Sequence, residues 1–138
     1  MRLYTLSPHI ADMRLHIEGN SLQELFLAGM EGMAQILKKD FCQNHMAFPL
    51  KHTVLLTAKD TTALLIDFLS EVLTYSLVEK AVFCRAEFTE LSAKTLNAKI
   101  YGIKTNRFDK DIKAVTYHEA KVKRNNKNRY ETIVVFDI

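Results

Sequence analysis

Residues 13–37 read MRLHIEGNSLQELFLAGMEGMAQIL and contain two structural patterns in succession. In the first, apolar and polar residues alternate, which is the period of a half-buried β-strand over about residues 13–18. In the second, Ser21 and Glu24 form a capping box, which predicts a helix that extends to about Leu37. A strand followed directly by an amphipathic helix is therefore the first unit of the predicted fold.

The same order of strand and helix recurs later in the chain. HTVLLTA (residues 52–58) reads as a strand, and the helix that follows can begin at Asp60 or Thr61 and extend to about Lys80. The remaining apolar segments all alternate like strands between turn residues, and they cover residues 81–90, 96–103, 112–123 and 130–138. These patterns predict an α+β fold, with two amphipathic helices packed on a mainly antiparallel sheet system of about six strands.

The last predicted strand closes in VVFDI, where an acid follows three apolar residues. The Asn-rich turn between Lys123 and Arg129 predicts that this strand pairs with the segment before it, which would hold its end in a sheet. Asp137 and the α-carboxylate of Ile138 would then place two negative charges at one spot. Because like charges that share a site need a cation to hold them together, this pair is a candidate cation site.

The length and composition limit the class of protein to which the chain can belong. The chain has 138 residues, of which 48% are apolar and 25% are charged, and these values suit one domain with a single core. Its first residues, MRLYTLSPHI, lack the apolar run of a signal peptide, and no later stretch has the roughly 20 apolar residues of a membrane span. We therefore expect one domain over residues 1–138, with no membrane partner and a cytoplasmic location.

The two cysteines, Cys42 and Cys84, have neither a CxxC spacing nor a nearby group of histidines. They cannot form a zinc site alone. Cys84 lies in an apolar strand pattern, where a reduced thiol acts as a small apolar side chain. The expectation is two reduced thiols in a reducing compartment.

The net charge of +3 is unevenly distributed, because residues 99–138 hold ten Lys or Arg against five acids. A polyanion such as RNA would meet this basic C-terminal third. Part of the excess lies in KVKRNNKNR, however, and solvated turns are commonly basic for that reason alone. An RNA-binding role for this third is one open alternative.

A second open alternative is a metal-dependent hydrolase or phosphoesterase. His9 and Asp12 lie in SPHIAD just before the first clear strand, and His118 is predicted to lie on the strand IKAVTYHEAKVK, so the three could share a small metal site. An isolated acid more often caps a turn, and a lone histidine is more often a packed or surface residue. The sequence holds no P-loop, GxSxG, HExxH or GxGxxG motif that would support catalysis.

Four stretches resemble the archease family, in order and across nearly the whole chain. They are PHIAD (residues 8–12), LLIDFLSEVLTY on the second predicted helix, IKAVTYHEAKV (residues 112–122) and the terminal VVFDI. The family's typical forms of the first three are PHTAD, LLVDWLNELLY and EVKAVTYHGLEV. The first and last motifs are short, but their placement at opposite ends of a chain of this size makes the combination specific.

The resemblance implies a non-catalytic activator of RtcB, the GTP-dependent RNA ligase of tRNA splicing and RNA repair. Archeases promote guanylylation of the ligase histidine and repeated turnover. The resemblance also implies a divalent cation, such as calcium, magnesium or manganese, held by Asp12, Asp137 and Ile138. Lys113, in the matched KAVTY stretch, is a candidate contact to a phosphate or an acidic ligase residue, and His9 and His118 are further candidates for partner contact.

This chain departs from the family pattern around its first aspartate. The threonine of PHTAD is replaced by Ile10, and the small or apolar pair that often follows the aspartate is replaced by Met13 and Arg14. Support for Asp12 by hydrogen bonds can therefore differ here. The property that this departure puts in question is the affinity for the cation.

Overall fold

The computed structural model describes residues 1–8 and 12–138 of the chain. Two strand and helix units are present, as predicted, in the form of a strand that precedes each of the two long helices. Along the chain the elements are β1 (Arg2–Pro8), β2 (Asp12–Gly19), α1 (Leu22–Leu37), the short 3-10 helix η1 (Cys42–Asn44), β3 (Leu50–Thr57), α2 (Thr61–Glu79), β4 (Ala81–Leu91), β5 (Thr95–Lys104), β6 (Ala114–Thr116), β7 (Lys123–Arg124) and β8 (Tyr130–Asp137).

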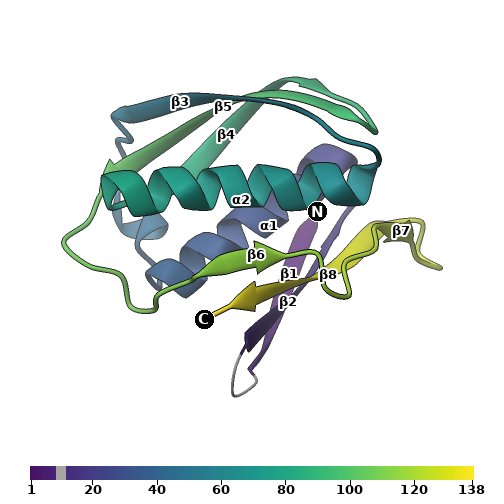
Figure 1. The fold of residues 1–138 in the computed structure, drawn as a ribbon, viewed down its shortest axis with the longest axis horizontal. Helices are drawn as coiled ribbons and strands as arrows, with labels where there is room; N and C mark the ends of the chain where they lie inside the picture. The colour runs from purple at the N-terminus through teal and green to yellow at the C-terminus, as the bar shows by residue number, and fades with distance from the viewer. Residues whose placement is uncertain (9–11) are drawn as a thin grey trace.

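Two antiparallel sheets enclose the helices (Figure 1). The first sheet has the strand order β1-β2-β8-β6, with β7 also paired to β8, and the second has the order β3-β5-β4. Helix α1 contacts β1 and β2 of the first sheet and β4 of the second, whereas α2 contacts β6 of the first sheet and all three strands of the second. The α+β class is confirmed, with the helices forming a layer between the sheets.

Both long helices begin at side-chain caps that the sequence predicts. The Ser21 hydroxyl accepts a hydrogen bond from the Glu24 amide at 3.2 Å, and the Glu24 carboxylate accepts one from the Asn20 amide at 2.8 Å. For α2 the cap is Asp60, whose carboxylate accepts from the Ala63 amide at 2.8 Å. Each cap satisfies amide groups that the first turn of a helix leaves without partners.

Strand β2 supplies the central part of the core. Its residues alternate between half-buried and buried, so that Leu15 and Ile17 are fully buried beneath α1. The helix approaches closely at Gly32, where an added Cβ atom would lie 2.5 Å from a methyl carbon of Leu15. The even-numbered residues of β2 consequently point to the opposite, outer face of the sheet.

Helix α2 alone, among the described residues, has the length and apolar composition of a membrane span. In this fold the apolar residues of α2 pack against protein and not against lipid, since α2 contacts strands of both sheets. Phe68 is completely buried and packs 5.6 Å from Phe88 of β4, measured between ring centroids. The apolarity of α2 is thus that of a core helix.

The strands differ from the predicted set at two places. The described residues contain eight strands, and the additional N-terminal strand β1 pairs with β2 along its whole length. Residues 112–123 were predicted as one strand but form only β6 and β7, with a turn between them. The turn is held by amide donors: Lys121 donates to the Thr132 hydroxyl at 2.8 Å, and Val122 donates to the Thr62 hydroxyl at 2.9 Å.

The expectation of two reduced thiols is wrong. Cys42 of η1 and Cys84 of β4 form a disulfide, with their Cα atoms 5.6 Å apart, and the inference of a reducing compartment loses its basis. The segment after α1 folds back onto β4, which the 42-residue separation of the cysteines could not reveal. A Cα separation of this size is the usual one for a disulfide.

Glu18 on the outer face of β2 anchors the turn that precedes β8. Asn125 donates to its carboxylate at 3.1 Å and Arg129 at 3.3 Å, while the Asn125 side chain also accepts from the amides of Lys127 and Arg129. The hydrogen bond from Asn125, together with the Arg129 contact, lowers the pKa of Glu18 against the opposing effect of burial. One carboxylate therefore fixes the turn that was predicted between Lys123 and Arg129.

Reduction of the Cys42–Cys84 disulfide is expected to lower the free energy of unfolding by about 4 kcal/mol, because the unfolded chain regains the freedom of a long loop. Urea unfolding with and without dithiothreitol measures the difference. A Cys42→Ser/Cys84→Ser variant should match the reduced protein and should not respond to the reductant. Equal stability of the oxidised and reduced wild type would contradict the prediction.

Replacement of Glu18 by Gln is expected to destabilise the fold by about 1 kcal/mol at neutral pH. Because the pKa of Glu18 is lowered on folding, its contribution is complete above the ordinary value of 4.5 and is lost as the pH falls through the lowered folded value. Urea unfolding from pH 7 to pH 3 should show the wild type and Glu18→Gln converging in acid. Asp111→Asn, which removes an exposed carboxylate, is the control and should show no such convergence.

Candidate functional site

The fold brings the two predicted aspartates together. Asp12 is the first residue of β2 and Asp137 is the last residue of β8, and the antiparallel register sets them directly opposite each other. Opposed residues of neighbouring strands project from the same face of the sheet, so the two carboxylates share one end of it. Ile138 follows at once, is half-buried and packs against the apolar core.

The surroundings of the two aspartates favour an oxygen-binding cation. The Oδ1 atom of Asp12 is buried and has no hydrogen-bond partner among the described residues. An unpaired buried carboxylate oxygen is costly, and a like charge on the opposite strand adds to the cost. Carboxylate oxygens are the preferred ligands of hard cations such as Ca²⁺, Mg²⁺ and Mn²⁺, so the chemistry of Asp12 and Asp137 fits the cation that the resemblance implies.

Lys113 adjoins this pair of aspartates through the main chain. Its amide donates to the carbonyl oxygen of Asp137 at 2.7 Å, and the next residue, Ala114, pairs with Asp137 in the β6–β8 ladder. The Lys113 side chain is exposed. The main chain of Lys113 therefore adjoins Asp137, and its side chain is open to solvent.

Of the two histidines predicted as candidate contacts, the structure describes only His118. His118 was predicted on a strand, but it lies in the turn after β6, where its side chain is 68% exposed and its Nε2 atom is 3.3 Å from Glu119. His9 lies outside the described residues. The hydrolase alternative grouped His118 with His9 and Asp12, and the contact that the structure gives His118 is with Glu119. Because His9 is outside the described residues, this grouping stays a prediction.

Sequence reasoning missed an ion pair between two charged residues at this end of the sheet. Arg14 follows Asp12 by two positions on the outer face of β2, and its guanidinium forms an ion pair with Glu119. The hydrogen bond with Glu119 raises the pKa of Arg14, and the negative charge of Asp12 acts in the same direction. The two-residue period of β2 was the signal for Arg14, whereas Glu119 was hidden because its segment was predicted as a strand.

The turn that carries His118 and Glu119 is fastened to α2. The Tyr117 hydroxyl donates to the Asp67 carboxylate, and this bond raises the pKa of Tyr117. The Ala120 amide closes the turn by donating to the Tyr117 carbonyl at 3.1 Å. Two of the four motifs noted in the sequence, on α2 and after β6, are thus joined by one hydrogen bond.

A second cluster of metal-ligand types lies farther along the same face, at His16, Glu18 and Glu131. Its groups already have partners: His16 contacts Glu131 at 3.0 Å, and Glu18 accepts from Asn125 and Arg129. Lys123 is also the strand neighbour of Glu131. The nearby positive charges oppose the entry of a divalent cation, so we interpret this cluster as an ion-pair network that holds the turn before β8.

The basic C-terminal third also uses part of its charge internally. Arg124 donates to the side chain of Asn128 at 2.9 Å and to the Tyr130 hydroxyl at 2.8 Å, and its guanidinium lies over the Tyr130 ring. Arg129 pairs with Glu18. These two arginines serve the structure of the turn, which weakens the argument from charge for an RNA-binding surface.

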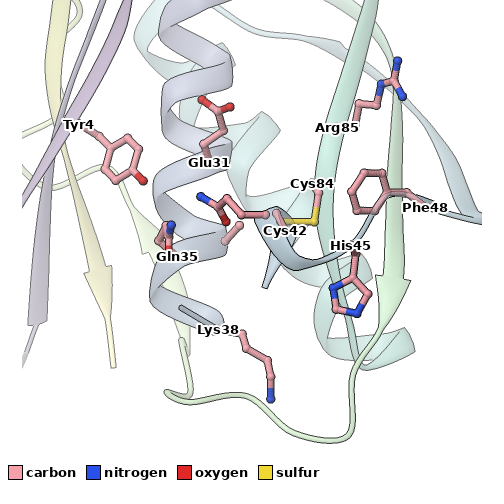
Figure 2. A pocket seen from close by; sticks show the side chains of 11 residues that line it. Tyr4, Glu31, Gln35, Lys38, Cys42, His45, Phe48, Cys84 and Arg85 are labelled. Atoms are coloured by element: carbon pink, nitrogen blue, oxygen red, sulfur yellow. A yellow bond between two sulfur atoms is a disulfide. The ribbon is translucent and has the colours of Figure 1, made fainter. Parts of the chain in front are cut away.

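A cavity of about 390 Å³ lies elsewhere, between α1, η1 and β4. Figure 2 shows the Cys42–Cys84 disulfide among its lining side chains, with the charged ends of Lys38 and Arg85 pointing away from the disulfide. The Lys38 ammonium is bound to the Arg107 carbonyl at 3.0 Å. The predicted cation ligands are absent from the lining, so this cavity is separate from the Asp12–Asp137 site.

Comparison with known proteins gives one consistent family. Residues 4–138 match the model of the archease protein family (MTH1598/TM1083). The protein archease of Pyrococcus abyssi is 30% identical over 138 residues, which cover 94% of this chain and 94% of the relative. That of Methanosarcina mazei is 29% identical over 129 residues, covering 88% of this chain and 86% of the relative.

Two solved structures share the fold. Protein 1598 of Methanobacterium thermoautotrophicum, solved in solution, superposes with a TM-score of 0.76 at 22% identity and covers 98% of both chains. The crystal structure of an archease from Thermotoga maritima, described as a possible chaperone, has a TM-score of 0.67 at 21% identity and covers 96% of both chains. The family match spans almost all of the sequence and agrees with these folds, so the chain belongs to the archease protein family.

Proposed function

We propose that this chain is an accessory protein of an RtcB-type, GTP-dependent RNA ligase and that it holds a divalent cation with Asp12, Asp137 and Ile138. Family membership supports the helper role, and the Thermotoga maritima archease is itself described as a possible chaperone. The ligase would carry out the chemistry of guanylylation and joining. The archease would act on the ligase, in tRNA splicing or RNA repair.

The observation that carries the cation proposal is the buried Oδ1 atom of Asp12, opposite Asp137, for which residues 1–8 and 12–138 supply no hydrogen-bond partner. The energetic cost of this arrangement is removed when a cation binds between the carboxylates. Sheet pairing supplies the two ligands from opposite ends of the sequence, and a main-chain oxygen of Ile138 would supply a third. Three protein groups leave coordination positions open for water or for groups of a partner.

The residues around the cation would have distinct tasks. Asp12 and Asp137 bind it, and the exposed ammonium of Lys113 offers a point contact to a phosphate or to an acidic residue of the ligase. When bound, the cation would supply positive charge that orders phosphate oxygens near the ligase. The main-chain hydrogen bond from Lys113 to Asp137 joins the segment that carries Lys113 to the end of β8.

Asp12→Asn and Asp137→Asn are each expected to reduce multiple-turnover ligation by at least about tenfold, because a lost ligand weakens a cation site at least as much as a lost supporting group does. The assay uses a cognate ligase in limiting amount, GTP and RNA ends bearing a 2′,3′-cyclic phosphate and a 5′-hydroxyl. Unaffected turnover in both variants would contradict the cation site. Failure of the wild type to stimulate the ligase would contradict the accessory role.

Two controls sharpen this assay. Asp111→Asn removes an exposed carboxylate from the segment before β6 and should stimulate the ligase as the wild type does. A chain extended by a few residues after Ile138 tests which oxygen of that residue is used. The extension should impair stimulation if the ligand is a terminal carboxylate, and it should be tolerated if the ligand is the carbonyl oxygen.

Cation binding should also be measurable without the ligase. At 100 times its dissociation constant, Ca²⁺ or Mn²⁺ should raise the free energy of unfolding of the wild type by about 2.7 kcal/mol. In EDTA, Asp137→Asn should be more stable than the wild type by up to about 1 kcal/mol, because the opposed charges are relieved, and it should not respond to the cation. Chemical unfolding in EDTA and in excess cation measures both the expected gain in stability of the wild type and the expected difference between Asp137→Asn and the wild type.

A further inference from the structure

At the Asp12 end of the first sheet, one strand carries an acceptor and a donor that find no partner in the described part of the chain. The acceptor is Oδ1 of Asp12, and the donor is Nε of Arg14, and both atoms are buried without a hydrogen-bond partner among the described residues. The two residues are separated by one position on β2 and therefore project from the same face. A guanidinium and a carboxylate in this arrangement would ordinarily bind each other.

Glu119 explains why they do not. Its carboxylate pairs with the guanidinium of Arg14 and also approaches His118 at 3.3 Å. Glu119 has a φ of 60°, and its turn is closed by the hydrogen bond between Ala120 and Tyr117. The Tyr117 hydroxyl is bound in turn to Asp67 of α2, so the carboxylate that engages Arg14 belongs to an anchored segment.

We infer that Arg14 is an affinity-determining residue of the cation site and that Glu119 acts as a latch that keeps the Arg14 guanidinium off Asp12. This inference rests on the proposed function, because it concerns the affinity of the same carboxylates for a cation. With Glu119 in place, the positive charge of Arg14 is offset and Asp12 remains available. With Glu119 neutralised, the guanidinium competes with the cation for Asp12.

The pair of Arg14 and Glu119 lies in partly shielded surroundings. The side chain of Arg14 is 26% exposed and that of Glu119 is 37% exposed, so both are partly shielded from water and their interaction is stronger than that of a fully exposed pair. The neighbouring residue of β8 is Val135, which is apolar and offers no alternative side-chain acceptor to Arg14. Removal of the Glu119 charge therefore leaves Asp12 as the carboxylate next to Arg14 on its own strand.

The test is a double-mutant cycle on Ca²⁺ affinity, measured by isothermal titration calorimetry on the full chain at pH 7.5. Arg14→Met should tighten binding by about tenfold, because a positive charge beside the site is removed. Glu119→Gln should weaken binding by about tenfold. In the double variant the Glu119 substitution should have little further effect, so its affinity should lie within about threefold of Arg14→Met.

Three outcomes would overturn the inference. The first is additivity, in which Glu119→Gln weakens binding equally in the wild type and in Arg14→Met, since Glu119 would then act on the cation directly. The second is weaker binding by Arg14→Met, which would make Arg14 a support of the site. The third is unchanged affinity in Glu119→Gln. Arg14→Lys keeps the charge and should stay within about threefold of the wild type, and the melting temperatures of the cation-free variants exclude a general loss of structure.

A second readout needs no cation and therefore separates this inference from the proposed function. In EDTA, the side-chain Nε–H signal of Arg14 in NMR spectra should exchange more slowly with water in Glu119→Gln than in the wild type, because the group then bonds to Asp12. The change should be absent in Glu119→Gln/Asp12→Asn if the acceptor is the charged carboxylate. If the wild type bound no cation, the cation site of the proposed function would be contradicted. If the exchange of the Arg14 Nε–H were the same in Glu119→Gln as in the wild type, the inference about Glu119 would be contradicted.

Discussion

The pairing of β2 with β8 is the constraint on which both the core and the candidate site depend. It joins a strand near the start of the chain to the last strand, and its register sets Asp12 opposite Asp137. The inner face of the same two strands buries Leu15 and Val134. A slip of one residue would turn those side chains to solvent, so the apolar core enforces the register that brings the two carboxylates together.

The predictable part of this molecule was its local structure. The alternation in β2 and the caps at Ser21 and Asp60 are short-range signals, and the structure has strands and helices where they predict them. The Cys42–Cys84 disulfide could not be predicted, because it depends on the return of η1 to β4. The turn that carries Glu119 was also missed, since hydrogen bonds from its amides to the hydroxyl oxygens of the remote residues Thr62 and Thr132 replace the strand pairing that its sequence pattern suggests.

The candidate site also has a part that the sequence could predict and a part that it could not. Asp12, Asp137 and Ile138 came from motifs at the two ends of the sequence, and the strand register that unites the aspartates is a property of the whole sheet. Arg14 could be assigned to the face of Asp12 from its spacing alone. Its pairing with Glu119 required the turn after β6, and that turn owes its place to the Tyr117–Asp67 contact with α2.

Arg14 follows Asp12 where the family often has a small or apolar residue, and the structure shows how the fold accommodates this charge. A lone arginine beside two carboxylates would neutralise one of them and oppose a divalent cation. Glu119 offsets that charge by pairing with the guanidinium of Arg14. The opposed carboxylates of Asp12 and Asp137 then remain as ligands, so the departure at Arg14 and its ion pair with Glu119 are consistent with a site that still binds a divalent cation.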